Sequence, residues 1–502
     1  MKYNLLWILI ATVLSSCSDF LEESSQDEVR PSTVDDLMQI MVGEAFPMDF
    51  LVYAYDDFLT DDVECFGSSG DETLESSIED KYTLFTWDDD MYEDCSGAMY
   101  NTWQQCYSKI MGCNTVMDYM DRVTGDEKTK RNMRGQTLVL RAYYYFLLVN
   151  YYAWPYNYGD PEKNLGVPLK LEMEVNDGYM ARNTVAEVYD QIITDLKEGI
   201  RLLEENEIKM SLYKMSDLTG KAILSRVYLY MEDWDNALTY ANMVLQKKST
   251  LTSLASAPEA AIVYQSTSNS WGLYNETVSN EIIWMYGGYR AYACYPIGGS
   301  YSKAPFAVSD DLLNIYDFNP DDKTNYGDLR RLMYYNYGAY IITIPYFHAS
   351  TYANYAFKGG KSKKWASHGI RTAEIYLNRA EVYIRKFMKT GEDNYRVLAL
   401  EDLNKLRENR YDTRNAAYSK VDISEADELL QFYKDERRRE LCFEGHRWFD
   451  LRRYGMPMLT HKYFVNEESS QEVSLLEKDP RYVLPIPRNV LERNPYLKQN
   501  ER

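Results

Sequence analysis

Apolar residues recur at helical spacing through much of this chain. Residues 137–152 are apolar or aromatic at nearly every position and end before Trp154-Pro155, which is typical of a buried helix. The next helix is predicted to begin at Asn183-Thr184, because Glu187 completes a capping box with the threonine. Its apolar positions then follow at four-residue steps: Val188, Ile192, Leu196 and Ile200. The pattern therefore predicts two long helices, the first of them buried.

Two further segments each predict a pair of helices. In residues 216–245 a cap at Ser216-Asp217 starts one helix, and a short turn at 232–234 separates it from the next. Residues 371–387 and 395–410 form the second pair. Helix pairs of about 34 residues are tetratricopeptide-like units, which stack into a superhelix whose surface binds other molecules. We therefore predict a mainly α fold with a repeat-type helical scaffold and few short strands.

The segments between these helices have a different composition. Residues 56–101 are acidic and contain Gly and Ser, whereas residues 249–364 are dense in Tyr, Gly and Asn. Residues 280–284 are the one stretch here that suggests a short strand. Long loops in an exported protein are usually functional, so we expect ligand-contacting residues in these two segments.

The N-terminus carries an export signal. Lys2 precedes an apolar run at 5–14 and the small residues Ser15-Ser16, which predicts a signal peptide over residues 1–16. The run is too short to span a bilayer, which needs ~20 apolar residues. Leu14 to Cys17 also looks like a bacterial lipobox, so we expect Cys17 to be acylated and to anchor the mature chain in the membrane. The alternative is a plain signal peptide with an incidental cysteine.

Charge and aromatic content favour a binding protein. The 55 basic residues are outnumbered by 77 acidic ones, giving a net charge of −22. Nucleic acids and anionic lipid surfaces need a basic footprint, so neither is expected as a partner. The chain has 47 Tyr against 16 Phe, and tyrosine offers a flat apolar face with a polar tip that suits wet binding surfaces.

Signals for catalysis, cofactors or metals are weak. The four histidines fit no zinc-protease or nucleophile motif, and no cofactor is predicted. Residues 359–362 imitate the end of a phosphate loop, but Tyr355 stands where its first glycine is needed. A partial calcium-loop pattern lacks its central glycine and has Asp in place of the final Glu, so a solvated acidic turn is the favoured alternative. Its four positions are Asp317, Asn319, Asp321 and Asp328.

Six cysteines remain after Cys17. They are Cys65, Cys95, Cys106, Cys113, Cys294 and Cys442. None has zinc-site spacing, and the exported compartment permits disulfides among the four that lie between 65 and 113. Free buried cysteines are the alternative, and the sequence leaves both open.

Several segments, in this order, resemble the SusD/RagB family of lipoproteins. They are residues 17–22 with 30–37, residues 103–114 (WxxCYxxIxxxN), residues 280–283 (NEII), residues 436–453 (ERRRELCFEGHRWFDLRR), and residues 484–487 (LPIP) with 494–500. The resemblance covers the mature chain and implies one SusD-like unit over 17–502. Its parts would be an N-terminal half at 17–248, a loop-rich insertion at 249–364 and a C-terminal helical part at 365–502.

The resemblance implies a function as well as a fold. The protein would be a non-catalytic lipoprotein on the outside of the outer membrane that captures glycan. It would pass the glycan to a SusC-type TonB-dependent transporter. The alternatives are the same role for a peptide or glycoconjugate cargo, and a surface glycosidase, for which the sequence supplies no motif.

The arginine-rich segment at 436–453 has a structural interpretation. Glu436, Glu440 and Glu444 lie four apart on one helical face and can pair with arginines inside the protein. The closing segment 484–487 alternates with prolines, which disfavours helix and predicts an extended strand of chain against the scaffold. We therefore expect both segments to hold the fold together.

The glycan site is expected on aromatic side chains in the two loop segments, as the resemblance implies. The candidates are Trp87, Tyr92, Trp271, Tyr274, Tyr289, Tyr292 and Tyr295. Amphipathic aromatics in polar or Gly-rich loops can stack on sugar rings. The alternative for each is a place in the core.

Overall fold

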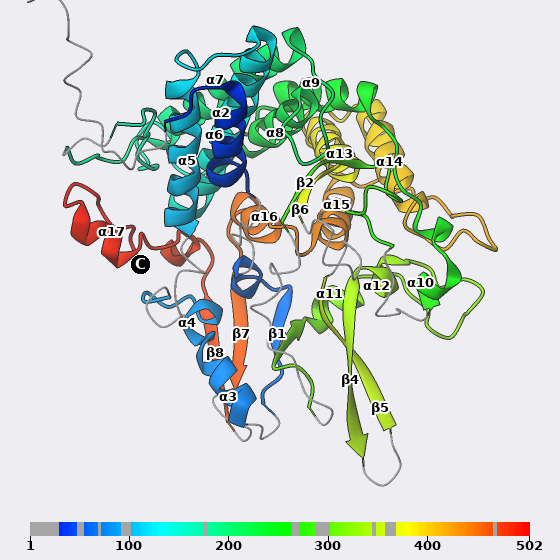
Figure 1. The fold of residues 1–502 in the computed structure, drawn as a ribbon. Helices are drawn as coiled ribbons and strands as arrows, with labels where there is room; N and C mark the ends of the chain where they lie inside the picture. Colours follow the sequence, from blue (N-terminus) through cyan, green and yellow to red (C-terminus); the bar gives the residue numbers. More distant parts are fainter. Residues whose placement is uncertain are drawn as a thin grey trace, which may run out of the picture.

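Figure 1 shows the fold of the chain in a computed structural model. The structure describes residues 30–47, 55–68, 72–91, 102–174, 178–263, 271–287, 302–343, 348–356, 368–464 and 469–502.

Successive helices pack side by side into one array, as the upper half of Figure 1 shows. The array consists of α5 (Thr102–Tyr119), α6 (Glu127–Tyr152), α7 (Val185–Glu205), α8 (Asp217–Tyr230), α9 (Trp234–Lys247), α13 (Thr372–Thr390) and α14 (Asp393–Glu408). Each helix contacts the next, and α13 packs on α9 although a long insertion separates them in sequence. The helix α15 (Ala426–Leu441) then packs against α13. The predicted mainly α scaffold of helix pairs is confirmed.

Helix starts follow the capping signals in the sequence. Thr184 caps α7 and forms a capping box with Glu187, and Ser216 caps α8. The buried helix predicted at 137–152 starts earlier than the apolar pattern indicates, at Glu127. Its first turns are polar, and the cap is the Asp126 carboxylate, which accepts a hydrogen bond from the Thr129 amide at 2.8 Å. The apolar run therefore marks the buried part of the helix and not its full length.

Short helices and two-stranded sheets complete the fold, and most of them lie below the array in Figure 1. The α-helices are α2 (Val34–Ile40), α3 (Glu72–Glu79), α4 (Tyr82–Phe85), α10 (Glu259–Val263), α11 (Asp310–Asn314), α12 (Arg330–Met333), α16 (Arg447–Arg453) and α17 (Arg488–Arg493). A π-helical turn, η1 (Met41–Ala45), follows α2, and 3-10 turns are η3 (Asp56–Leu59), η5 (Leu254–Ser256) and η7 (Pro480–Tyr482).

Four antiparallel pairs of strands are present in the described part of the chain. They are β1 (Val63–Cys65) with β3 (Phe306–Val308), β2 (Ile282–Tyr286) with β6 (His368–Arg371), β4 (Tyr335–Thr343) with β5 (His348–Ala356), and β7 (Leu459–Phe464) with β8 (Ser470–Leu475). The strand suggested at 280–284 is β2, and all five of its residues are buried. It pairs with β6 directly before α13, so it joins the insertion to the helical array.

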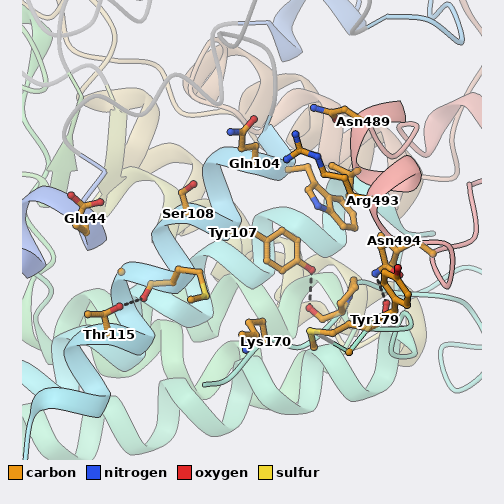
Figure 2. A pocket seen from close by; sticks show the side chains of 18 of the residues that line it. Glu44, Gln104, Tyr107, Ser108, Thr115, Lys170, Tyr179, Asn489, Arg493 and Asn494 are labelled. Carbon is orange, nitrogen blue, oxygen red and sulfur yellow. Dashed lines mark hydrogen bonds between the residues drawn. The ribbon is translucent and has the colours of Figure 1, made fainter. Parts of the chain in front are cut away.

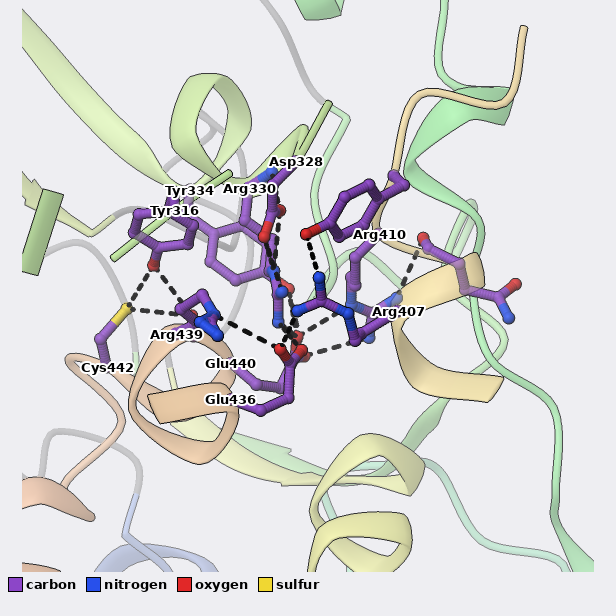
Figure 3. A network of polar contacts seen from close by, with 12 residues as sticks. Tyr316, Asp328, Arg330, Tyr334, Arg407, Arg410, Glu436, Arg439, Glu440 and Cys442 are labelled. Carbon is purple, nitrogen blue, oxygen red and sulfur yellow. Dashed lines mark hydrogen bonds and ion pairs between the residues drawn. The ribbon is translucent and has the colours of Figure 1, made fainter. Parts of the chain in front are cut away.

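The arginine-rich segment forms a buried ionic network (Figure 3). The Glu440 carboxylate on α15 receives hydrogen bonds from Arg371 at 2.7 Å, Arg410 at 2.9 Å and Arg330 at 3.1 Å. Glu436, one turn earlier, pairs with Arg407 at 2.6 Å. Burial alone would raise the pKa of Glu436, but the charges of the arginines beside it outweigh burial and lower that pKa to about 2. The predicted structural role of this segment is confirmed.

The closing segment is extended and held at both ends. Leu484 and Ile486 are buried, and the Leu484 amide donates to the Tyr151 carbonyl at 2.9 Å. The Gln499 side chain bonds both backbone groups of Ile486 at 2.8 Å. These bonds pair the backbone groups of Leu484 and Ile486, which a segment interrupted by prolines could not pair in a regular β-ladder. The predicted extended conformation is confirmed.

Four cysteines in the described ranges are free thiols. Cys65, Cys106, Cys113 and Cys442 are buried, and burial raises the pKa of the Cys106 thiol well above its ordinary value. A thiol kept protonated in this way is a poor nucleophile. Cys95 and Cys294 lie outside the described residues.

No helix in the part of the chain that the structure describes is both long and apolar enough to cross a membrane.

Candidate functional site: a cleft beside α5

A cleft of about 1060 Å³ lies between α5 and the C-terminal helix α17 (Figure 2). Its floor is one face of α5, whose residues Gln104, Ser108, Met111 and Thr115 are spaced four, three and four apart. That spacing places them in one row along a helix. One wall is formed by residues 168–170 and 178–180, and the other is formed by α17 and the residues after it.

Hydrogen bonds fix both walls. The Tyr107 hydroxyl donates to the Pro168 carbonyl at 2.7 Å, which ties the first wall to α5. The Asn494 amide donates to the Met180 carbonyl at 2.8 Å, which ties the two walls together. Arg182 adds bonds to the Lys498 carbonyl at 3.0 Å and the Asn500 side chain at 2.8 Å. The cleft is therefore formed before any ligand arrives.

Two exposed tyrosines stand at its edge. Tyr179 lines the cleft and is 56% exposed, and Tyr496 is 64% exposed. Their rings stack with centroids 5.7 Å apart and 25° between planes. Deeper in the cleft, Trp103 packs on Tyr107 with centroids 5.1 Å apart. Exposed aromatic faces beside a cleft are suited to stacking against a flat apolar ligand face.

Polar groups around the cleft are directed to solvent. The side chains of Ser108, Asn489 and Arg493 form no hydrogen bond or ion pair with the described residues, and all three are exposed. Gln104 is also exposed in the row on α5. Amide, hydroxyl and guanidinium groups together offer both donors and acceptors to a hydroxylated ligand.

The lining carries one carboxylate within the described residues, that of Glu44. Glycoside hydrolysis ordinarily uses two carboxyl groups on either side of the bond that is cut. The cleft as described thus offers the groups for binding a polar ligand and lacks that pair.

The described residues contain no group of three or more His, Cys, Asp or Glu side chains placed to hold a metal ion. Of the four partial calcium-loop positions, Asp328 is buried and pairs with Arg330 at 2.7 Å. Asp317, Asn319 and Asp321 are exposed, and the Asn319 side chain accepts from the Asp321 amide at 3.1 Å. The acidic-turn alternative fits this geometry, because Asp328 points into the ionic network.

Two of the predicted aromatic platforms are core residues, and their prediction as exposed platforms is wrong. Trp87 is fully buried, its indole N–H donates to the Leu59 carbonyl at 3.0 Å, and its ring stacks on His461 at 4.2 Å. Tyr274 is also fully buried and donates its hydroxyl to Glu444. Because both rings are buried, neither can contact a ligand. The prediction failed because the sequence of a short polar loop does not reveal whether its aromatic side chain turns inward.

The other predicted positions remain predictions. Trp271 is half-buried against the edge of the core. Tyr92, Tyr289, Tyr292, Tyr295 and the lipidation candidate Cys17 lie outside the described residues.

Sequence reasoning missed Tyr179 and Tyr496. Each follows a turn-forming residue, Gly178 or Pro495, in a polar stretch. The row on α5 was visible as three polar residues at helical spacing, but a polar row on a helix is usually a solvated face. Only the fold shows that α17 and the residues after it, almost 400 residues away in sequence, face this row.

Comparisons with known proteins agree with one another. A family model described as "Starch-binding associating with outer membrane" matches residues 19–229, and a model of the SusD family matches residues 321–502. A SusD-like protein, P2, of Formosa agariphila is 24% identical over 539 aligned positions, covering 99% of each chain.

Solved structures share the fold. A SusD-like carbohydrate-binding protein from Bacteroides vulgatus aligns with a TM-score of 0.63 at 20% identity, covering 93% of this chain and 97% of that one. A SusD superfamily protein from Bacteroides thetaiotaomicron aligns with a TM-score of 0.64 at 20% identity, covering 94% and 100%. With the helical array and the buried arginine–glutamate segment, the two family matches show that this chain belongs to the SusD/RagB family.

Proposed function

We propose that this protein is a carbohydrate-binding lipoprotein of the outer membrane that captures glycan at the cell surface and passes it to a SusC-type TonB-dependent transporter. The observation that carries the proposal is the match of residues 19–229 to a family described as starch-binding and associated with the outer membrane. That segment contains α5 and the floor of the cleft.

The chemistry of the cleft supports a sugar as ligand. Sugar rings have apolar C–H faces that stack on aromatic rings, and their hydroxyls need hydrogen bonds from protein side chains. Tyr179 supplies an exposed aromatic face at the edge of the cleft, and Gln104, Ser108 and Asn489 supply polar groups inside it. We place the main carbohydrate contacts here, with Trp271 and the tyrosines at 92, 289, 292 and 295 as further candidates.

Binding is tested by affinity electrophoresis of the purified protein through gels that contain neutral or acidic polysaccharides. We expect retardation by at least one glycan, with the retained glycan unchanged in length after prolonged incubation. Retardation by none would contradict the carbohydrate role and favour the alternative of a peptide or glycoconjugate cargo. Shortened glycan would contradict the non-catalytic role.

The anchor is proposed at Cys17, behind a signal peptide of residues 1–16. Replacing the cysteine, Cys17→Ala, removes the thiol that would be acylated, so the variant should leave the membrane fraction. Metabolic labelling with a fatty-acid analogue and protease treatment of whole cells measure lipidation and surface exposure. A Cys17→Ala protein that is still labelled and surface-exposed would contradict the anchor.

The transporter is proposed as the partner that takes the glycan onward. Extraction in mild detergent followed by affinity purification of this protein should recover a porin-sized TonB-dependent transporter. Recovery of the protein alone, with the transporter present in the same membranes, would contradict this part of the proposal.

A further inference from the structure

The described lining of the cleft is opposite in charge to the whole chain. The protein carries a net charge of −22, whereas the described lining residues that are charged at neutral pH are Lys170, Arg493 and Glu44. Among these residues there is one more positive than negative charge. In Figure 2, Glu44 lies at the far end of the cleft from Arg493, so the two do not neutralise each other locally.

Arg493 differs from the other arginine of its helix. Arg488 is paired with Asp90 at 2.6 Å, but the Arg493 guanidinium has no hydrogen bond or ion pair with any described residue. It is exposed and lines the cleft opposite Gln104 on α5. Elsewhere in the described chain, arginines are commonly engaged by carboxylates, as in the network around Glu440. An arginine that has no partner among the described residues, in a cleft of an acidic protein, is a group that can bind an anionic ligand.

The Arg493 guanidinium is suited to binding a sugar carboxylate. A guanidinium presents parallel N–H groups in a plane, which match the two oxygens of a carboxylate. At the same end of the cleft, Tyr179 on the facing wall offers a ring face and Asn489 offers an amide. One sugar unit could thus stack on the tyrosine while its hydroxyls bond the amide and its carboxylate meets the arginine.

We infer that the cleft between α5 and α17 binds an oligosaccharide that contains uronic acid, with Arg493 recognising the sugar carboxylate. This inference rests on the proposed carbohydrate role and narrows it to a substrate class.

The test compares each acidic sugar with its neutral ester. Calorimetry on the full mature protein would use a galacturonate hexamer and a mannuronate hexamer, each as free acid and as methyl ester. We expect at least one free acid to bind about tenfold more tightly than its ester, because the ester removes the charge and keeps the ring. Arg493→Gln should abolish this preference, whereas Arg131→Gln, an exposed arginine on α6 that does not line the cleft, should keep it.

The outcomes distinguish a failure of the uronic-acid inference from a failure of the proposed carbohydrate-binding function. Equal binding of acid and ester, or a preference that survives Arg493→Gln, would overturn the uronic-acid inference while carbohydrate binding stands. Tighter binding of a sulfated oligosaccharide of the same length would also overturn the carboxylate assignment. Failure of these probes together with every glycan of the gel panel would overturn the proposed function itself.

Discussion

Arginines gather in two regions of this molecule and do different things in each. Around Glu440 they are buried, and Arg330, Arg371 and Arg410 all contact the same carboxylate. Figure 3 shows Arg330 and Arg410 beside Glu440. In the cleft beside α5, Arg493 is exposed and has no partner among the described residues. The arginines of the buried network are thus closed to ligands, whereas Arg493 is accessible to one.

Charge balance explains the difference. The network joins five arginines to five carboxylates: Arg330, Arg371, Arg407, Arg410 and Arg439 with Glu281, Asp328, Glu436, Glu440 and Glu444. Glu281, Asp328 and Arg330 of this network belong to the insertion. Glu281 and Arg330 pair with residues of α15, at the start of α13 and after α14, so the network holds the insertion against the helical array. A buried pair contributes little over an apolar core, but losing one member leaves uncompensated charge.

The largest expected effect follows from that asymmetry. Glu440→Ala should lower the free energy of unfolding by at least about 3–5 kcal/mol or prevent folding, because three buried arginines lose their shared carboxylate. The matched control is Arg201→Ala, which breaks an exposed pair with Glu205 and should cost less than about 1 kcal/mol. Denaturant titration followed by circular dichroism measures both. Equal losses in the two variants would contradict the structural role of the network.

Acid should weaken the network next. The pKa of Glu436 is held at about 2 in the folded protein and returns to its ordinary value, near 4.5, on unfolding. A lowered folded pKa means that the stabilisation is complete above about pH 4.5 and is lost as the pH falls toward 2. For this one group the loss is on the order of 3 kcal/mol.

Denaturation curves from pH 6 to pH 2 measure this effect. We expect the free energy of unfolding to fall steadily below about pH 4.5. A free energy that stays level down to pH 2.5 would show that the buried carboxylates are not held ionised by their arginines.

A smaller effect is expected where the cleft floor meets η1. A Cβ added at Gly112 would lie 2.5 Å from the Glu44 carbonyl oxygen, so Gly112→Ala must push η1 away from α5. We expect a loss of about 1–3 kcal/mol, the usual cost of overpacking. Gly43→Ala, on the η1 side, meets nothing within 4 Å and is the control. Melting temperatures of the two variants should differ, and a Gly112→Ala protein as stable as the control would contradict the close packing seen here.

The smallest change in stability is expected at the cleft edge, where binding should suffer instead. Tyr179 is exposed, so Tyr179→Ala should change the free energy of unfolding by less than about 0.5 kcal/mol. A stacked ring contributes on the order of 1 kcal/mol, so glycan affinity should fall about fivefold. Leu476→Ala, equally exposed and outside the cleft lining, should leave affinity unchanged. Equal affinity of Tyr179→Ala and wild type would remove this ring from the site.

The sequence predicted the scaffold well because its signals are local. Caps at Thr184 and Ser216 and the apolar run ending at Tyr152 each act within a few residues of the helix they define. The network was also predictable in kind, since Glu436 and Glu440 share one face of α15. The expectation that Glu444 continues this face is wrong, because the helix ends at Leu441 and Glu444 lies in the turn that follows. The partner arginines of the network were not predictable, because residues 330, 371 and 410 meet there only through the tertiary fold.

The site was harder to predict for the same reason. Whether an aromatic residue in a loop faces the core or the solvent depends on what the fold places against it. Trp87 turns inward because the Leu59 carbonyl and the His461 ring are there to receive it. Tyr179 is exposed, and the ring beside it is that of Tyr496, which is exposed as well. None of these neighbours is adjacent in the sequence.

The most direct test of the central claim is a crystal structure of the protein with the oligosaccharide that binds it most tightly. The account predicts sugar density in the cleft between α5 and α17, with a ring against Tyr179 and a sugar oxygen within hydrogen-bond distance of the Arg493 guanidinium. Sugar bound elsewhere on the molecule, for example against Trp271, with the cleft holding only solvent, would contradict it.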